Sequence, residues 1–175
     1  MTREQQPLRV SAEKLGFRHA EDTLQAELTL INHEERPVFV TVGIRQVVYE
    51  EASRTLTLWL SDHGRTHDAR HSCGSVYLPQ IEILEPGARR TIQLSLAQRL
   101  TRLVPHPDQT FHFESLDLSP AEHLIVHIGY SDRPFYYTPK GPAAIEQLKA
   151  WCSDLQVEGR KIKPTRSGKA PQRKK

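Results

Sequence analysis

The chain has 175 residues, of which 37% are hydrophobic and 26% charged, a composition typical of soluble globular proteins that excludes a wholly disordered chain. This length suffices for one domain with a substantial core and an appended segment. No apolar run approaches the ~20 residues that span a bilayer, and the first ten residues lack the apolar core of a signal peptide. We therefore expect a cytoplasmic protein without a membrane span.

Charge is distributed unevenly along the chain. The formal net charge is +3, yet residues 159–175 contain eight lysine or arginine residues and no acid, whereas residues 1–158 contain 16 basic and 21 acidic residues, a net charge of −5. The sequence thus predicts an acidic body with a basic tail. The two cysteines, Cys73 and Cys152, are too few for a disulfide framework and fit a reducing compartment.

Apolar and polar residues alternate along most of the body, which is the pattern of strands with one buried face. The predicted strands are, in chain order, 8–17, 24–30, 38–44, 56–60, 76–84, 91–96, 110–118 and 124–130. Strands at intervals of roughly 12 to 20 residues favour an antiparallel β-sandwich over alternating helices and strands. We place this domain at residues 1–138.

Two stretches of the body resemble sequence patterns of a known superfamily. The first is Leu28–Asn32 followed by Arg36–Val40, and the second is Ile83–Gly87 followed by Thr91–Leu94. These strand–turn–strand sequence patterns resemble those of immunoglobulin-like and fibronectin-III-like bacterial domains, and the resemblance covers residues 8–130. The resemblance implies an antiparallel immunoglobulin-like β-sandwich. It implies no activity, because sandwich domains host many functions.

A cluster of candidate metal ligands lies in residues 62–74, DHGRTHDARHSCG, between two predicted strands. Its members are His63, His67 and His71, spaced four residues apart, and Cys73. The segment is most simply a solvated connecting loop, although a long one. If it formed a short helix, its imidazoles would share one face and, with the thiolate, would suit zinc or another borderline metal. A catalytic Cys-His pair is the third alternative, and it would need an orienting group that the sequence does not identify.

An aromatic cluster follows the last predicted strand. Together with a tryptophan of the next segment, the candidate partner-binding residues are Tyr130, Arg133, Phe135, Tyr136, Tyr137 and Trp151. Aromatic rings beside an arginine are typical of interface cores, because they bury much area at little entropic cost. The competing interpretation, equally supported by the sequence, is that these rings pack under a C-terminal helix.

That helix is predicted over residues 139–156, because Ile145, Leu148, Cys152 and Leu155 share one face and a proline lies in the first turn. We favour packing of its apolar stripe on an open end or edge of the sandwich, since exposed apolar stripes are uncommon on soluble monomers. The alternative is that the helix docks on a partner protein.

Residues 157–175 are predicted to be disordered, since they lack apolar periodicity and carry a run of like charges interrupted by proline and glycine. The candidate polyanion-binding residues are Arg160, Lys161, Lys163, Arg166, Lys169, Arg173, Lys174 and Lys175. These side chains could neutralise phosphates of RNA or of another polyanion with little sequence preference. The alternative is a tail that only increases solubility.

Signatures of catalysis are missing from the sequence: it contains no P-loop, no dinucleotide-binding glycine pattern and no nucleophile elbow. His112 and His127 fall on outward positions of predicted strands, so we expect them on an exposed sheet face. The sequence thus predicts a non-enzymatic cytoplasmic module that binds a protein partner and contacts a polyanion through its tail. Two alternatives are a metal-binding protein or metal-dependent enzyme, with zinc in the 62–74 loop, and a nucleic-acid-associated protein acting through the tail. No other cofactor is predicted.

Overall fold

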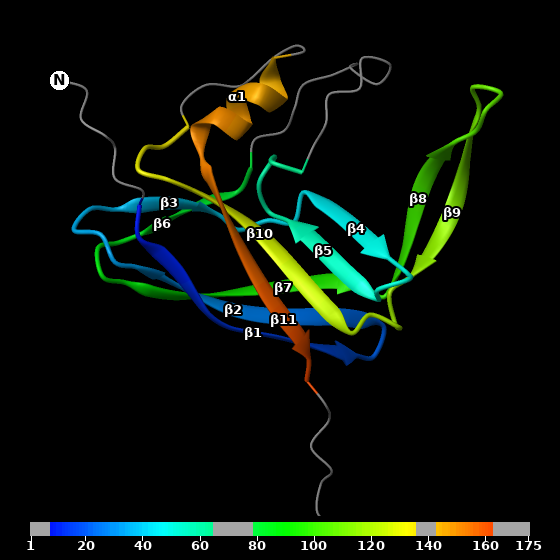
Figure 1. Cartoon of the computed structure of the whole chain (residues 1–175), viewed down its shortest axis with the longest axis horizontal. Coiled ribbons are helices and arrows are strands. Elements are labelled where there is room, and N and C mark those ends of the chain that lie inside the picture. Colours follow the sequence, from blue (N-terminus) through cyan, green and yellow to red (C-terminus); the bar gives the residue numbers. More distant parts are fainter. Residues whose placement is uncertain (1–7, 65–78, 136–142, 163–175) are drawn as a thin grey trace, which may run out of the picture.

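The computed structural model describes residues 8–64, 79–135 and 143–162, and most of them lie in strands (Figure 1). Within these residues the fold is all-β apart from one short helix, so the predicted class is confirmed at this level. The elements are β1 (Val10–Ala20), β2 (Thr23–Asn32), β3 (Val38–Thr41), β4 (Gln46–Glu50), β5 (Thr55–Trp59), β6 (Ile81–Leu84), β7 (Arg89–Ala97), β8 (Arg99–Pro105), β9 (Phe111–Asp117), β10 (His123–Ser131), α1 (Ala144–Trp151) and β11 (Ser153–Lys161). No helix in the described ranges is long and apolar enough to cross a membrane.

Nine strands form one sheet in the order β4-β5-β10-β11-β1-β2-β7, and β3 joins it by pairing with both β10 and β6. Two pairs, β1 with β11 and β10 with β5, are parallel, and the other pairs are antiparallel. The sheet is therefore mixed, which corrects the expectation of a purely antiparallel sandwich. Alternation along one strand records which face is buried and does not record the direction of the neighbouring strand.

The core lies inside the curl of this sheet, because β10 and β11 cross in front of β2 and β7 (Figure 1). The alternation predicted in residues 24–30 is confirmed, since Leu24, Ala26, Leu28 and Leu30 are all buried. They belong to one cluster with the alternate apolar residues of β5 and β10. Burial of these faces from several strands is the main favourable term that holds the curled sheet together.

The C-terminal elements differ from the prediction. The helix ends at Trp151 rather than continuing to residue 156, and the segment expected to begin the tail forms strand β11 instead. Leu155 and Val157 are two residues apart and pack against the core, which is the period-two pattern of a strand, although Leu155 also fits the helical spacing that starts at Ile145. β11 pairs with β10 on one side and with β1 on the other, which makes it an interior strand of the sheet.

A glycine permits the close approach of β11 to β1. The pairing of β1 with β2 shifts register between Glu13 and Gly16, where Lys14 has a positive φ of 50°, so β1 bulges at this point. A Cβ atom on Gly159 would lie 2.5 Å from the backbone oxygen of Leu15. Any side chain at position 159 would therefore force the two strands apart.

Besides β11, two strands were not predicted, namely β4 and β8. Both lie between predicted strands, β4 within residues 45–55 and β8 within residues 97–109. The predicted strand 110–118 is confirmed as β9, which pairs with β8 in a separate two-stranded sheet. The predicted strand 76–84 is confirmed from Ile81 onward, and residues 65–78 lie outside the described part of the chain.

Candidate functional site

The outer surface of β5, β10 and β11 carries a group of polar and aromatic side chains that we call the His127 cluster. Its members are Trp59, Ser61, His63, His127, Cys152 and Asp154. His127 lies directly opposite Trp59 in the parallel pair of β10 and β5, and the two rings stack with their centroids 3.5 Å apart. The Nδ1 atom of His127 lies 2.6 Å from Oδ2 of Asp154. His127 is 9% exposed, which corrects the expectation that it lies on an open sheet face.

Serine, histidine and aspartate occur together here, but not in the order that nucleophilic catalysis requires. Ser61 Oγ donates to Oδ1 of Asp154 at 3.3 Å, while the imidazole of His127 binds the other carboxylate oxygen. The carboxylate thus lies between the hydroxyl and the imidazole. In a catalytic triad the imidazole lies between the other two groups, because it must take the proton of the hydroxyl. The arrangement fits a role in joining strands.

His63 and Cys152 form the second half of the cluster. The Nε2 atom of His63 lies 2.9 Å from the backbone oxygen of Cys152 and 3.7 Å from its Sγ atom. A carbonyl oxygen only accepts, so Nε2 carries the proton of the ring. Burial, with smaller effects of Asp62 and Asp154, raises the pKa of the Cys152 thiol to about 12. The thiol is therefore neutral at physiological pH, and the imidazole atom nearest to it in the described chain, Nε2 of His63, already carries a proton and cannot accept one. This arrangement does not suit a nucleophile.

A buried ion pair holds the chain that leads into the cluster. Arg45 and Asp62 are joined by two contacts, Nε to Oδ2 at 3.0 Å and Nη2 to Oδ1 at 3.1 Å. Their side chains are 11% and 2% exposed. The backbone N–H of Arg45 also donates to the carbonyl of Trp59 at 2.7 Å, so the segment before β4 is fixed to the end of β5.

The predicted zinc site is represented in the structure by one of its four residues. His63 lies in the described chain, whereas His67, His71 and Cys73 lie outside it. Within the described ranges, no group of three or more histidine, cysteine, aspartate or glutamate residues could hold a metal ion. The zinc site therefore stays a prediction from the sequence.

The aromatic segment after β10 packs against α1. Trp151 is buried, its Nε1 donates to the carbonyl of Arg133 at 2.8 Å, and its ring meets that of Phe135 edge to face. Tyr130 is half-buried against the core. These contacts support the interpretation that the rings pack with the C-terminal helix, while Arg133 stays exposed. Tyr136 and Tyr137 lie outside the described residues.

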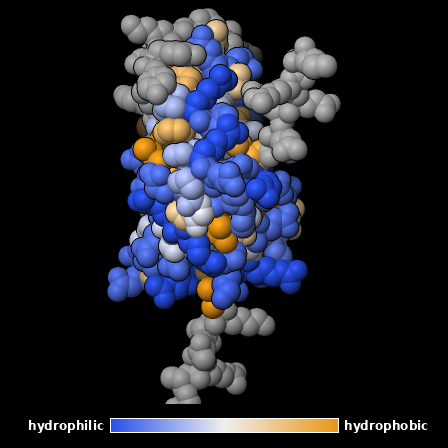
Figure 2. All heavy atoms as spheres, turned by 90° about the vertical axis from the view of Figure 1, so that its left-hand side faces the viewer, coloured by the Kyte–Doolittle hydropathy of each residue, from blue (hydrophilic) through white to orange (hydrophobic). Residues whose placement is uncertain are grey.

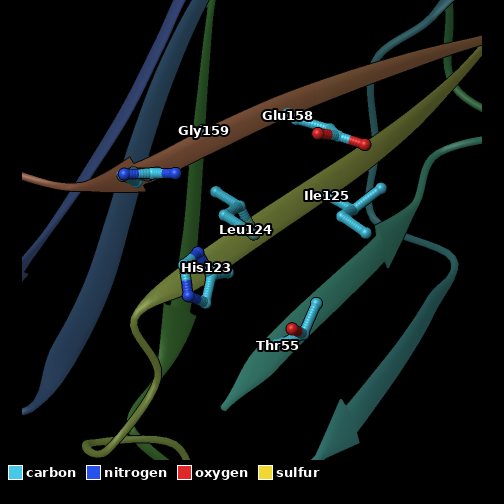
Figure 3. A pocket seen from close by; sticks show the side chains of 7 residues that line it. Thr55, His123, Leu124, Ile125, Glu158 and Gly159 are labelled. Carbon is cyan, nitrogen blue, oxygen red and sulfur yellow. The ribbon is translucent and has the colours of Figure 1, made fainter. Parts of the chain in front are cut away.

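A shallow hollow of about 430 Å³ lies on the outer surface of the same three strands, nearer the end of β11. Thr55, His123, Ile125 and Glu158 line it (Figure 3). Arg160 also lines the hollow, and it lies directly opposite His123 in the pairing of β10 with β11. Of the candidate polyanion-binding residues, Arg160 lies at this hollow and Lys161 follows it on β11, and both occupy exposed positions. The other six, Lys163, Arg166, Lys169, Arg173, Lys174 and Lys175, lie outside the described chain.

The third surface is an arm formed by β8 and β9, which extends away from the main sheet (Figure 1). In its connecting turn the Asp108 carboxylate accepts hydrogen bonds from the hydroxyl and the N–H of Thr110, and these bonds lower the pKa of Asp108. Phe111 and Phe113 lie two residues apart on one face of β9, and they are 48% and 77% exposed. Both residues fall in the predicted strand 110–118 at alternating positions, a pattern that does not distinguish an exposed apolar face from a buried one.

Comparisons with known proteins identify no family for this chain, since no protein-family model and no curated protein matches it. The solved structures similar to it include two crystal structures of β-glucosidase from Listeria innocua, one in complex with isofagomine and one of a mutant in complex with laminaribiose. Both are 10% identical over 87% of this chain, with TM-scores of 0.27 and 0.25, and the chain spans 16% of their length. At these TM-scores the similarity carries no argument about fold or function.

Proposed function

We propose that the chain is a non-enzymatic module that binds a protein partner through the face of the β8–β9 arm that bears Phe111 and Phe113. The observation that carries this proposal is the 77% exposure of Phe113 on a two-stranded arm that extends from the sheet. Exposure of a phenylalanine ring to water is unfavourable in free energy, and burial of such rings contributes much of the free energy of protein association.

The rest of the surface supports this choice. The face in Figure 2 is mainly hydrophilic, and its apolar residues form small, separate patches. The other large apolar residues that are exposed in the described chain are Val48, Ile83 and Ile162, which lie singly on different segments. Isolated exposed apolar residues are ordinary on soluble proteins, whereas two neighbouring aromatic rings on one strand indicate a contact surface.

The chemistry of the His127 cluster also favours binding over catalysis. The Cys152 thiol is neutral, and the imidazole of His127 is occupied by Asp154 on one side and by Trp59 on one face. Location in the cytoplasm and relationship to immunoglobulin-like domains remain part of the same proposal, on the sequence grounds given above.

The proposal is tested with an affinity-tagged copy expressed in the organism's own cells. We expect at least one protein to be retained by the wild type and lost from a variant that combines Phe111→Ser with Phe113→Ser. A matched control combines Val48→Ser with Ile83→Ser, which removes similarly exposed apolar groups elsewhere and should leave retention unchanged. Identical sets of retained proteins from all three baits would contradict the proposal.

Contact with a polyanion is a second candidate function, and the pairing of Arg160 with His123 beside the hollow favours it. Lys161 follows on the same strand, so the first cations of the basic segment are held at the sheet surface. We expect a labelled single-stranded RNA to bind with an affinity that falls steeply with salt. Truncation after Ile162 should weaken binding and flatten the salt dependence, and Arg160→Ala with Lys161→Ala should weaken it further. If the RNA affinity measured by fluorescence anisotropy is the same for both variants and the wild type, binding of a polyanion by this surface and tail is ruled out.

A further inference from the structure

The outer edge of β9 offers hydrogen-bonding groups of the backbone at the two exposed phenylalanines. At the two ends of the arm, the N–H of His106 donates to the carbonyl of Thr110 and that of Leu118 donates to the carbonyl of Gln98. The register between these ends is continuous, so the even-numbered residues of β9 direct their N–H and C=O groups toward β8. The odd-numbered residues, Phe111, Phe113 and Ser115, direct theirs to the opposite edge. Within the described chain β9 pairs with β8 alone.

We propose that the partner of this arm is a second copy of the chain, and that the two β9 strands pair antiparallel about a two-fold axis at Phe113. This inference rests on the proposed function, because it names the partner of the same surface. In this register Phe113 faces the partner's Phe113 in a hydrogen-bonded pair, and Phe111 faces the partner's Ser115. The arms then form a four-stranded sheet, which is more stable than an isolated two-stranded hairpin. Four exposed rings gather on one face of that sheet.

Charge complementarity selects this register. His112 lies opposite the partner's Glu114, and by symmetry Glu114 lies opposite the partner's His112. The sequence Phe111-His112-Phe113-Glu114 is therefore self-complementary about Phe113. An imidazole and a carboxylate at facing positions hydrogen-bond when the ring is neutral and attract more strongly when it is protonated.

The other edge of the arm is poorly suited to the same pairing. On β8 too, the odd-numbered residues direct their backbone N–H and C=O groups away from the neighbouring strand of the arm. These residues are Arg99, Thr101, Leu103 and Pro105. Proline has no N–H to donate, so the β8 edge lacks one hydrogen bond. Pairing of β8 with its copy about Arg102 would also place two arginines opposite each other. The β9 edge contains no proline.

The oligomeric state of the purified full chain tests the inference. We expect sedimentation velocity to show dimers that dissociate on dilution through the micromolar range. His112→Glu places two carboxylates opposite each other and should weaken the dimer by about tenfold or more, since each of two symmetric pairs changes from attraction to repulsion. His112→Lys at the same position keeps the opposite charges and should preserve the dimer. A monomeric wild type at 100 µM or equal dissociation constants for the two variants overturns the inference.

Cross-linking tests the register. In a Cys73→Ser background, Phe113→Cys should form a disulfide with its copy on mild oxidation, because hydrogen-bonded antiparallel residues have Cα atoms about 5.5 Å apart. Ser115→Cys should not, since residue 115 faces residue 111 of the partner. Equal cross-linking of both variants, or none of Phe113→Cys, contradicts the register. If purified protein is monomeric while retention of another protein still depends on Phe111 and Phe113, self-association is wrong and the proposed function stands.

Discussion

The imidazole of His127 lies flat on the indole of Trp59, with the two ring planes 10° apart, at directly paired positions of β10 and β5. At its edge, the Nδ1 atom of the same imidazole binds Asp154 at the start of β11. One side chain therefore joins three neighbouring strands on the outer surface of the sheet. This is the region where the chain returns from α1, so the contact fixes the entry of β11 into the sheet.

We expect His127→Ala to lower the free energy of unfolding by about 2 kcal/mol, because the stacked pair and the hydrogen bond to Asp154 are both lost. The matched control is His123→Ala, four residues earlier on the same face of β10, where the side chain is exposed. That change should stay within about 0.5 kcal/mol. Urea denaturation followed by circular dichroism measures both values. Equal changes in unfolding free energy for the two substitutions would show that the contacts of His127 do not stabilise the fold.

The Arg45–Asp62 pair should behave as a coupled unit. Asp62→Ala removes a carboxylate partner from a side chain that is 11% exposed, and we expect destabilisation by about 3 kcal/mol. Replacement of both residues, Arg45→Met with Asp62→Leu, should cost less than the sum of the single substitutions, because neither charge is then left in the interior. A double-mutant cycle of unfolding free energies measures the coupling, and strict additivity would contradict it.

Cys152 should react slowly while the protein is folded. Its pKa is raised from an ordinary value of 9.0 to about 12, so at pH 8 almost none of the thiol is ionised. In a Cys73→Ser background, we expect alkylation by iodoacetamide to be slow in buffer and fast in denaturing urea. Fast alkylation of the folded protein would contradict the burial of this thiol.

The same shift predicts how stability depends on pH. Between pH 9 and pH 12 the unfolded chain loses the Cys152 proton while the folded protein keeps it, so the unfolded state binds fewer protons. The contribution of this group is complete below pH 9 and is lost as pH rises toward 12. Cys152→Ala should therefore flatten the alkaline fall in unfolding free energy relative to the unmodified chain, and an identical slope would contradict the assignment.

Gly159→Ala should destabilise the sheet by about 2 kcal/mol, because the added methyl group would lie 2.5 Å from the backbone oxygen of Leu15. Glu158→Ala, at the preceding exposed position, is the control and should have little effect. The unfolding temperatures of the two variants, compared with that of the wild type, measure this difference. A stable Gly159→Ala protein would mean that β1 and β11 separate more easily than their register indicates.

The sequence predicted much of the core and little of the sheet's connectivity. Leu24 to Leu30 and Leu124 to Ile128 alternate because each strand has one face in the core, and that local pattern is visible in the residues themselves. The parallel pairing of β10 with β5 depends on residues far apart in the chain, which alternation does not encode. For the same reason the contact of Trp59 with His127 could not be predicted, although both occupy outward positions.

The candidate surfaces were likewise predictable where they depend on residue type and unpredictable where they depend on how strands pair. Arg160 and Lys161 were identified by charge alone, yet their place in an interior strand was missed because Leu155 was assigned to a helical stripe. Phe111 and Phe113 were predicted to lie in a strand, and their exposure becomes apparent only when β9 is found in an arm outside the main sheet.

The position of β11 also constrains how the protein can be made. Among the described strands, β1 and β2 precede β10 in the chain, but in the strand order of the sheet β11 lies between β10 and the group formed by β1, β2 and β7. A nascent chain that has not yet released residues 153–161 from the ribosome therefore holds two incomplete half-sheets, each with an open inner edge. Completion of the domain must follow translation of its last strand, and such late, non-local pairing is slow. Until then β1 and β10 are the edges that a chaperone would have to protect.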